Sequence, residues 1–211
     1  DPLWRKYKTF TLRVVVIKKD SSPEVKYEIF ERLNKGAVQL NNQELRNCIY
    51  RGPYNDLIIE LSEDKDFLFL LGLNDPDPRM RDKELVLRFL AFYHTPYLNY
   101  KGPMKYFLNK EMEKYRYINK READELRKVC RKSVELCKYV FGEKSFRRFV
   151  LGDSNNPNGY WEKKINKALF DITMWGFTLY EKNQIIPFSD SIREELIFLM
   201  TSDEEFIESI T

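Results

Sequence analysis

The chain has 211 residues, of which 43% are hydrophobic and 33% are charged. Its 36 basic and 33 acidic residues leave a formal charge of +3, which excludes the strong basic excess of a chain that binds nucleic acid over its whole surface. The three cysteines form no CxxC pair, so we expect reduced thiols in a cytoplasmic protein. No apolar stretch is long enough to span a bilayer, and we expect no membrane contact.

The segment Thr9–Ile17, with the sequence TFTLRVVVI, is the one convincing strand because β-branched residues cluster in it. A single strand cannot pair its own backbone groups. We therefore expect the chain to be a piece of a longer protein, in which upstream strands of the same protein pair with this one.

From residue 18 onwards the pattern is helical. The segment PEVKYEIFERLN, residues 23–34, has an apolar stripe made of Val25, Ile29, Phe30 and Leu33. Gly36 follows as a C-cap. The next predicted helix opens at NNQEL, where Asn41 and Glu44 have capping-box spacing, and it ends at Gly52. A further helix begins at Pro53.

The segment MRDKELVLRFLAFY, residues 80–93, is apolar nearly all round and predicts a central buried helix. It carries Asp82, Glu84 and Arg88, which form either an internal ion pair or the wall of a site. Further helices are predicted over residues 121–141, 161–180, 190–200 and 203–210. The expected fold class is mainly α, a multi-helix bundle with one N-terminal strand.

A basic cluster near the loop at residues 145–159 is a candidate contact for nucleic acid. It consists of Arg147, Arg148, Lys163, Lys164 and Lys167, with Phe146, Phe149, Tyr160 and Trp161 as aromatic neighbours. Phosphate contact and base stacking would use this mixture of residues. The alternative is that the lysines are solvated and the aromatic rings are core.

Residues for independent catalysis are missing from the sequence. His94 is the only histidine, so no two-histidine metal set and no triad with a spare histidine can form, and no glycine-rich phosphate loop is present. We therefore predict no catalytic residues, no metal ligands and no cofactor bound by this chain alone.

The stretch FERLNKGAVQLNNQELRN, together with RMRDKELVLRFLAFY and INKALFDITMWGF, resembles the GmrSD-like family of modification-dependent restriction and phage-defence proteins across nearly the whole chain. The resemblance implies a ParB-like N-terminal half whose Asp-Gly-Gln-Gln-Arg motif is associated with nucleotide hydrolysis, and in many members a C-terminal HNH nuclease. Neither motif is present here. A nucleoside triphosphate and a divalent cation are therefore expected only in the full-length protein.

The resemblance also implies a division into residues 1–34, the tail of the ParB-like half, and residues 35–211, a helical domain. Around the junction it implies residues that support the nucleotide site or couple it to the helices, namely Glu31, Arg32, Asn34, Glu44, Arg46 and Asn47. Helix capping is the alternative explanation for Asn34 and Glu44.

The resemblance thus favours a helical fragment of a nucleotide-dependent protein that senses DNA modification and couples the nucleotide site to DNA recognition or cleavage. DNA and a second copy of the chain are its possible partners. The alternative function is a helical module for protein interaction or oligomerisation, with no role for nucleotide or DNA.

Overall fold

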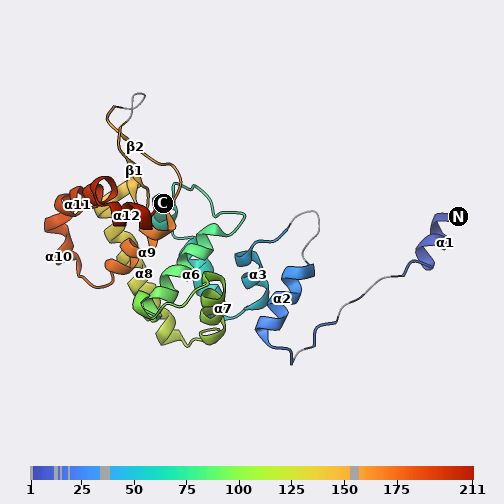
Figure 1. The fold of residues 1–211 in the computed structure, drawn as a ribbon. Helices are drawn as coiled ribbons and strands as arrows, with labels where there is room; N and C mark the ends of the chain where they lie inside the picture. The colour runs from blue at the N-terminus through green and yellow to red at the C-terminus, as the bar shows by residue number, and fades with distance from the viewer. Residues whose placement is uncertain (1, 12–13, 15, 19, 34–38, 153–156) are drawn as a thin grey trace.

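The computed structural model describes residues 2–11, 14, 16–18, 20–33, 39–152 and 157–211, and their fold is mainly helical, as predicted (Figure 1). The helices are α1 (Pro2–Lys8), α2 (Pro23–Leu33), α3 (Asn42–Ile49), α4 (Pro53–Ser62), α5 (Lys65–Leu71), α6 (Arg81–His94), α7 (Met104–Lys114), α8 (Lys120–Phe141), α9 (Lys167–Gly176), α10 (Lys182–Ile185), α11 (Ser189–Ser202) and α12 (Glu204–Ser209). Short 3-10 turns, η1 (Tyr97–Asn99), η2 (Gly142–Lys144) and η3 (Ile186–Phe188), join some of them.

Helix α6 is the centre of the core. It packs against α3, α4, α7, α8 and α9, and Leu87, Leu90 and Ala91 have no exposed surface. The prediction of a central buried helix at residues 80–93 is therefore confirmed. Its neighbour α8 buries Cys130 and Cys137, and burial raises the pKa of the Cys130 thiol to about 12.

Asparagine caps fix where several helices begin. The Asn41 side chain accepts hydrogen bonds from the backbone N–H groups of Gln43 and Glu44, and the Glu44 carboxylate accepts from the Asn41 N–H at 2.6 Å. This is the predicted capping box, and Asn119 and Glu122 form another at the start of α8. Such caps satisfy backbone donors that the first helical turn leaves unpaired.

The expected N-terminal strand is absent from the described residues of the segment Thr9–Ile17, and Leu12, Arg13 and Val15 lie outside those residues. A strand needs a neighbouring strand for its backbone hydrogen bonds, and the described residues offer none there. In Figure 1, α1 and the described residues that follow it form an arm that lies away from the helical body. The strands of the described chain are instead β1 (Phe149–Val150) and β2 (Tyr160–Trp161).

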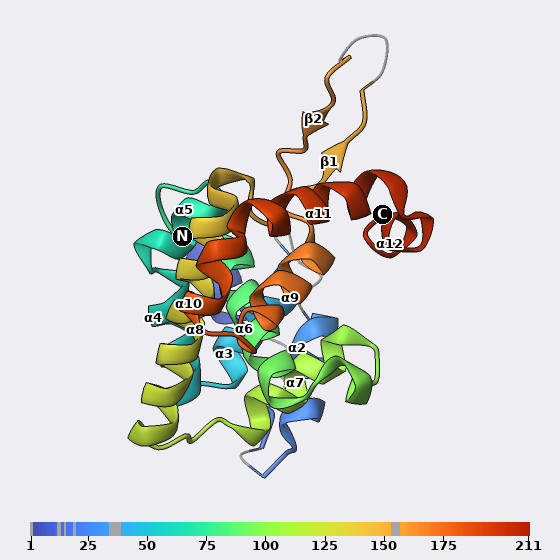
Figure 2. The same ribbon diagram turned by 90° about the vertical axis from the view of Figure 1, so that its left-hand side faces the viewer.

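Strands β1 and β2 pair antiparallel, with Phe149 opposite Trp161, and the hairpin projects beyond α11 (Figure 2). The hairpin shortens the helix predicted over residues 161–180, which begins only at Lys167. Asn166 explains this start, because its side chain accepts hydrogen bonds from the N–H groups of Ala168 and Leu169 and caps α9.

The predicted apolar stripe of α2 is not its buried face. Val25, Phe30 and Leu33 are 46%, 44% and 60% exposed, whereas Tyr27 is 1% exposed and donates from its hydroxyl to Asn42 Oδ1 at 2.9 Å. The described chain therefore leaves an apolar face of α2 uncovered. Asn34 and Gly36 lie outside the described residues.

Deletion of residues 1–18 should leave the melting temperature unchanged, because Trp4, Tyr7 and Phe10 are 57%, 75% and 69% exposed and bury little surface. Tyr27→Ala in the same background is the control and should cost about 3 kcal/mol, as expected for a buried aromatic residue. Thermal unfolding measures both, and a clear drop in stability on deletion alone would show that the arm packs on the body.

Candidate functional site

Arg46 of α3 is a fully buried arginine, 1% exposed. Its Nε donates to Asn109 Oδ1 of α7 at 2.9 Å, and its Nη1 donates to Gln43 Oε1 at 2.9 Å. The same Nη1 lies 3.5 Å from Glu84 Oε2 of α6. Burial lowers the pKa of the Arg46 guanidinium, but an arginine keeps its charge in a protein. The guanidinium therefore holds three helices together through one buried charge.

Glu84 extends this network to α9. Its Oε1 accepts from Lys167 Nζ at 2.7 Å, while its Oε2 faces Arg46. Burial alone would raise the pKa of the Glu84 carboxyl, but the hydrogen bond and charge of Lys167, with the charge of Arg46, lower it overall. Glu84 is thus an ionised carboxylate between a buried cation and a cation at the surface.

The other two members of the predicted charged cluster make separate contacts. Arg88 forms a bidentate ion pair with Asp171 of α9, in which Nε lies 3.0 Å from Oδ1. Asp82 accepts from the backbone N–H of Asp77 at 2.9 Å and so holds the loop before α6. Sequence reasoning missed Asp171, although a lone carboxylate in the apolar segment KALFDITMW was a usable signal.

The predicted coupling residues divide into several sets. Glu44 pairs with Arg79 at 3.2 Å, beside the Arg46 network. Asn47 instead accepts from the Asn55 side chain of α4 at 2.9 Å. Glu31 pairs with Lys105 of α7 at 2.7 Å.

Arg32 is exposed, with Glu28 at 3.9 Å as its partner within α2. Asn34 lies outside the described residues. The structure therefore brings Arg46 together with Glu84, places Glu44 against Arg79 at the start of α3, and leaves Glu31, Arg32 and Asn47 elsewhere.

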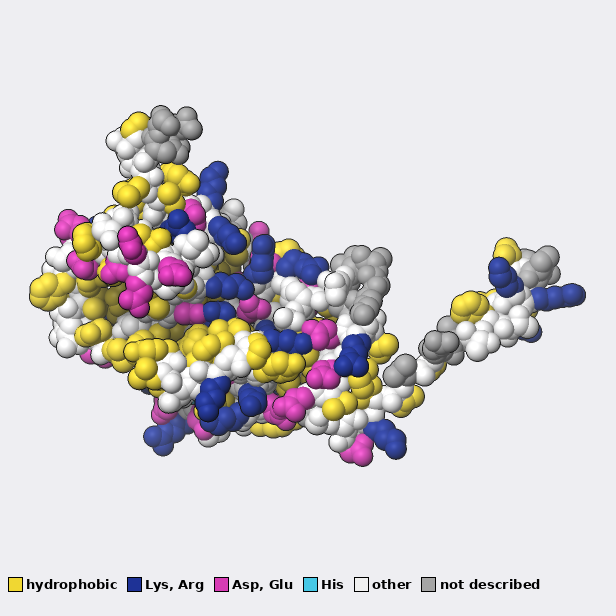
Figure 3. Space-filling view, in the orientation of Figure 1, with side chains coloured by type: hydrophobic (Ala, Val, Ile, Leu, Met, Phe, Trp, Pro, Cys, Tyr) yellow, Lys and Arg dark blue, Asp and Glu magenta, His cyan; other side chains and the backbone are white. Residues whose placement is uncertain are grey.

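A cavity of about 430 Å³ opens beside the network, and we call it the Gln43 cavity. The residues that line it are Asn41, Gln43, Arg79, Met80, Arg81, Glu84 and Lys167. A neighbouring cavity of about 330 Å³ shares Arg81 and Lys167 and is also lined by Lys163 and Lys164. Figure 3 shows Lys and Arg side chains close together on the face between the hairpin and α3.

The two arginines of the predicted basic cluster are engaged within the protein. Arg147 Nη1 donates to the carbonyls of Leu70 at 2.8 Å and Ser145 at 2.9 Å, and Arg148 Nη1 donates to Thr211 Oγ1 at 3.1 Å. Lys163 and Lys164 are exposed.

The aromatic neighbours are mostly packed. Phe146 is 3% exposed, and Phe149 packs edge-on against Trp161, whereas Tyr160 is 44% exposed. The structure thus leaves the lysines, rather than the arginines and most of the rings, open to a partner.

A second buried polar cluster surrounds Glu111 of α7. Its Oε1 accepts from the Tyr54 hydroxyl at 2.5 Å and lies 2.7 Å from His94 Nδ1. The His94 ring stacks on Tyr115 at 3.9 Å between centroids. Sequence reasoning identified His94 alone, because its carboxylate partner is 17 residues away and looks like one of many charges on a helix face.

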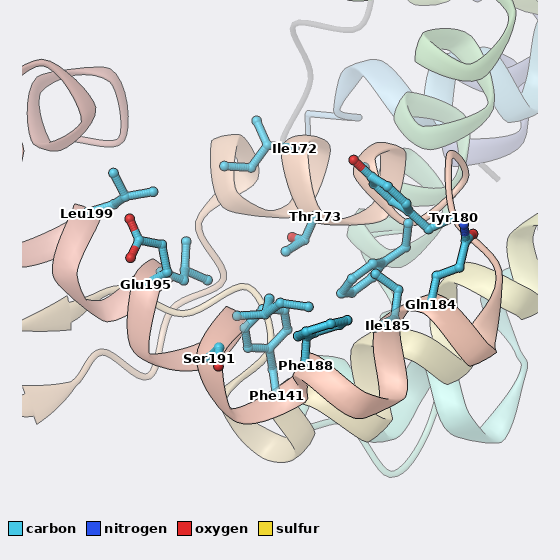
Figure 4. A pocket seen from close by; sticks show the side chains of 14 residues that line it. Phe141, Ile172, Thr173, Tyr180, Gln184, Ile185, Phe188, Ser191, Glu195 and Leu199 are labelled. Carbon is cyan, nitrogen blue, oxygen red and sulfur yellow. The ribbon is translucent and has the colours of Figure 1, made fainter.

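An apolar groove of about 770 Å³ lies between α9, α10 and α11. Figure 4 shows Ile172 and Tyr180 on one side of the groove and Phe188 and Glu195 on the other. Nearby Phe198 and Leu179 are 57% and 59% exposed. Exposed apolar surface of this kind is typical of a surface that binds another protein.

Comparison of the chain with protein-family models, with curated proteins and with solved structures finds no match. None of the described helices is long and apolar enough to cross a bilayer. The described residues also hold no group of three or more His, Cys, Asp or Glu side chains placed to bind a metal ion.

Arg46→Met should lower the free energy of unfolding by about 3 kcal/mol, because it leaves two buried amides and the partly buried Glu84 carboxylate without the guanidinium they share. Arg32→Met is the matched control and should change that free energy by less than about 0.5 kcal/mol, since Arg32 is exposed. Urea unfolding monitored by circular dichroism compares them. Equal effects of the two changes would contradict the structural role of Arg46.

The contribution of Glu84 should depend on pH. A carboxyl whose pKa is lowered on folding stabilises the protein above its unfolded pKa of about 4.3, and this stabilisation is lost as pH falls through the lower folded value. The difference in unfolding free energy between wild type and Glu84→Gln should therefore shrink below about pH 4. A difference in unfolding free energy that stays constant from about pH 7 to about pH 3 would contradict a lowered pKa of Glu84 in the folded protein.

Glu125→Gln is the control for the removal of one glutamate charge. Its ion pair with Arg121 is solvent-exposed, so the change in unfolding free energy at about pH 7 should be less than about 0.5 kcal/mol.

Proposed function

We propose that this chain is the helical part of a GmrSD-like, nucleotide-dependent defence protein of the cytoplasm, and that it contacts the phosphate backbone of DNA. The contact is a basic surface made of Arg79, Arg81, Lys163, Lys164 and Lys167. The observation that carries the proposal is that these side chains come from two distant segments and line two adjoining cavities. Phosphate contacts of this kind position a protein on DNA without reading its sequence.

The Arg46 network supports a coupling role for the same region. Lys167 belongs to the basic surface and, through Glu84, to the network that includes Arg46 and α3. Helix α3 packs on α2, whose exposed apolar face of Val25, Phe30 and Leu33 is suited to cover by upstream strands of a ParB-like half. A nucleotide-dependent change in that half would then reach the basic surface through α3.

Binding of a fluorescent DNA duplex, measured by anisotropy at several salt concentrations, tests the proposal. Affinity should fall steeply with salt, with a slope near one per phosphate contacted. The double reversal Lys163→Glu/Lys164→Glu should abolish binding to all sequences alike, because both side chains are exposed and contact phosphate only.

The matched control is Lys120→Glu/Lys128→Glu on α8, where both lysines are also exposed. This double variant changes the net charge by the same amount as Lys163→Glu/Lys164→Glu, but it should keep most of the affinity for DNA. Equal loss in both double variants, or no salt-sensitive binding by the wild type, would contradict a specific DNA contact.

The alternative function is a helical module that holds a partner protein or a second copy of the chain. The apolar groove between α9, α10 and α11 favours it. In that case light scattering would show a stable oligomer or complex, Phe188→Glu would disrupt it, and reversal of Lys163 and Lys164 would have no effect.

A further inference from the structure

Gln43 is a buried amide whose NH2 group is unsatisfied. Its side chain is 1% exposed, and Nε2 has no hydrogen-bond acceptor among the described residues. The orientation of the amide is fixed, because Oε1 accepts from Arg46 Nη1, and a guanidinium can only donate. Buried polar groups are almost always paired, so the free N–H of Gln43 requires an explanation.

The surroundings of Gln43 indicate what kind of acceptor is missing. Gln43 lines its cavity together with three cationic side chains, those of Arg79, Arg81 and Lys167. The arginine contacts to Glu44 and Asp77 use Nη2 of Arg79 and Nε of Arg81, and each guanidinium carries further N–H groups. Several N–H donors around one cavity match an anion with several oxygens.

The size of the cavity and its one acidic neighbour agree with this assignment. A volume of about 430 Å³ is far more than a single water needs and lies within the range of small-ligand sites. Among the described residues that line the cavity, Glu84 has the only carboxylate. Its negative charge is compensated by Arg46 on one side and Lys167 on the other. The cavity is therefore lined by hydrogen-bond donors and has no uncompensated negative charge that would repel an anion.

We propose that the Gln43 cavity binds a phosphoryl group, with the Gln43 amide as a neutral donor and Arg79, Arg81 and Lys167 as cationic donors. The group belongs either to a nucleoside polyphosphate or to the DNA backbone. In the second case this inference rests on the proposed function, but the central role of Gln43 does not depend on Lys163 or Lys164.

Gln43→Glu is the variant that removes the proposed donor. It keeps an oxygen that can accept from Arg46, and it replaces the NH2 donor with a carboxylate oxygen, so the lost donor and the added negative charge both oppose binding of an anion. Inorganic phosphate and pyrophosphate are the probes, with binding measured by titration calorimetry and ³¹P line broadening. Wild type should bind pyrophosphate saturably, and folded Gln43→Glu should bind it at least about tenfold more weakly.

Gln184→Glu is the control for the added charge, since the Oε1 of Gln184 also accepts a hydrogen bond, from the Glu181 backbone N–H, but Gln184 lines the apolar groove. It should bind pyrophosphate like wild type. If Gln43→Glu unfolds, Arg81→Gln tests the same cavity, because Arg81 is 76% exposed at its side chain and its loss should weaken binding without unfolding. Absence of saturable binding by wild type, or equal binding by Gln43→Glu and Gln184→Glu, would overturn the proposal.

Competition identifies the source of the phosphoryl group. Displacement of pyrophosphate by a nucleoside triphosphate but not by a DNA duplex assigns the cavity to a nucleotide, and the reverse assigns it to DNA. Lys163→Glu/Lys164→Glu separates this inference from the proposed function. Loss of duplex binding with retained pyrophosphate binding supports both, whereas retained duplex binding contradicts the proposed DNA contact and leaves the cavity assignment standing.

Discussion

The burial of the Arg46 charge is the constraint on which the arrangement of the helices depends. A guanidinium taken out of water is tolerated only when acceptors surround it, and here they come from α3, α6 and α7. Asn109 and Gln43 supply neutral oxygens, and Glu84 supplies the counter-charge. These helices cannot shift relative to one another without breaking a contact to a buried cation, so the network fixes their register as well as their proximity.

The same constraint explains why the cavity lies where it does. Gln43 must point its oxygen at Arg46, and this turns its N–H group away from the guanidinium and leaves the group unsatisfied. Glu84 must face Arg46 with one oxygen, and its other oxygen is then available to Lys167 at the start of α9. The buried network thereby positions a neutral donor and a surface cation around one cavity, on helices rather than on loops.

Periodicity and capping in the sequence predicted the buried helix at residues 80–93, the capping box at Asn41, and the helix over residues 121–141, because those signals are local. Tertiary pairing decided the rest. Asn109 is 63 residues from Arg46 and looks like a solvated amide, and nothing near Arg46 indicates that it is buried. The helix at residues 161–180 was predicted too long because the hairpin pairing of β1 with β2 overrides the apolar pattern before Asn166.

Lys167 is the element through which a ligand and the network would influence each other. In its ion pair with Glu84 the Lys167 side chain is about half exposed, and an ion pair of this kind stabilises a protein by at most about 1 kcal/mol. A phosphoryl group can therefore compete for Lys167 at low cost, which leaves Glu84 with Arg46 as its remaining cation. A movement of α3 that changes the distance between Arg46 and Glu84 would therefore change the affinity for phosphate. Because linkage between two sites is reciprocal, phosphate binding would change the free energy of that movement by an equal amount.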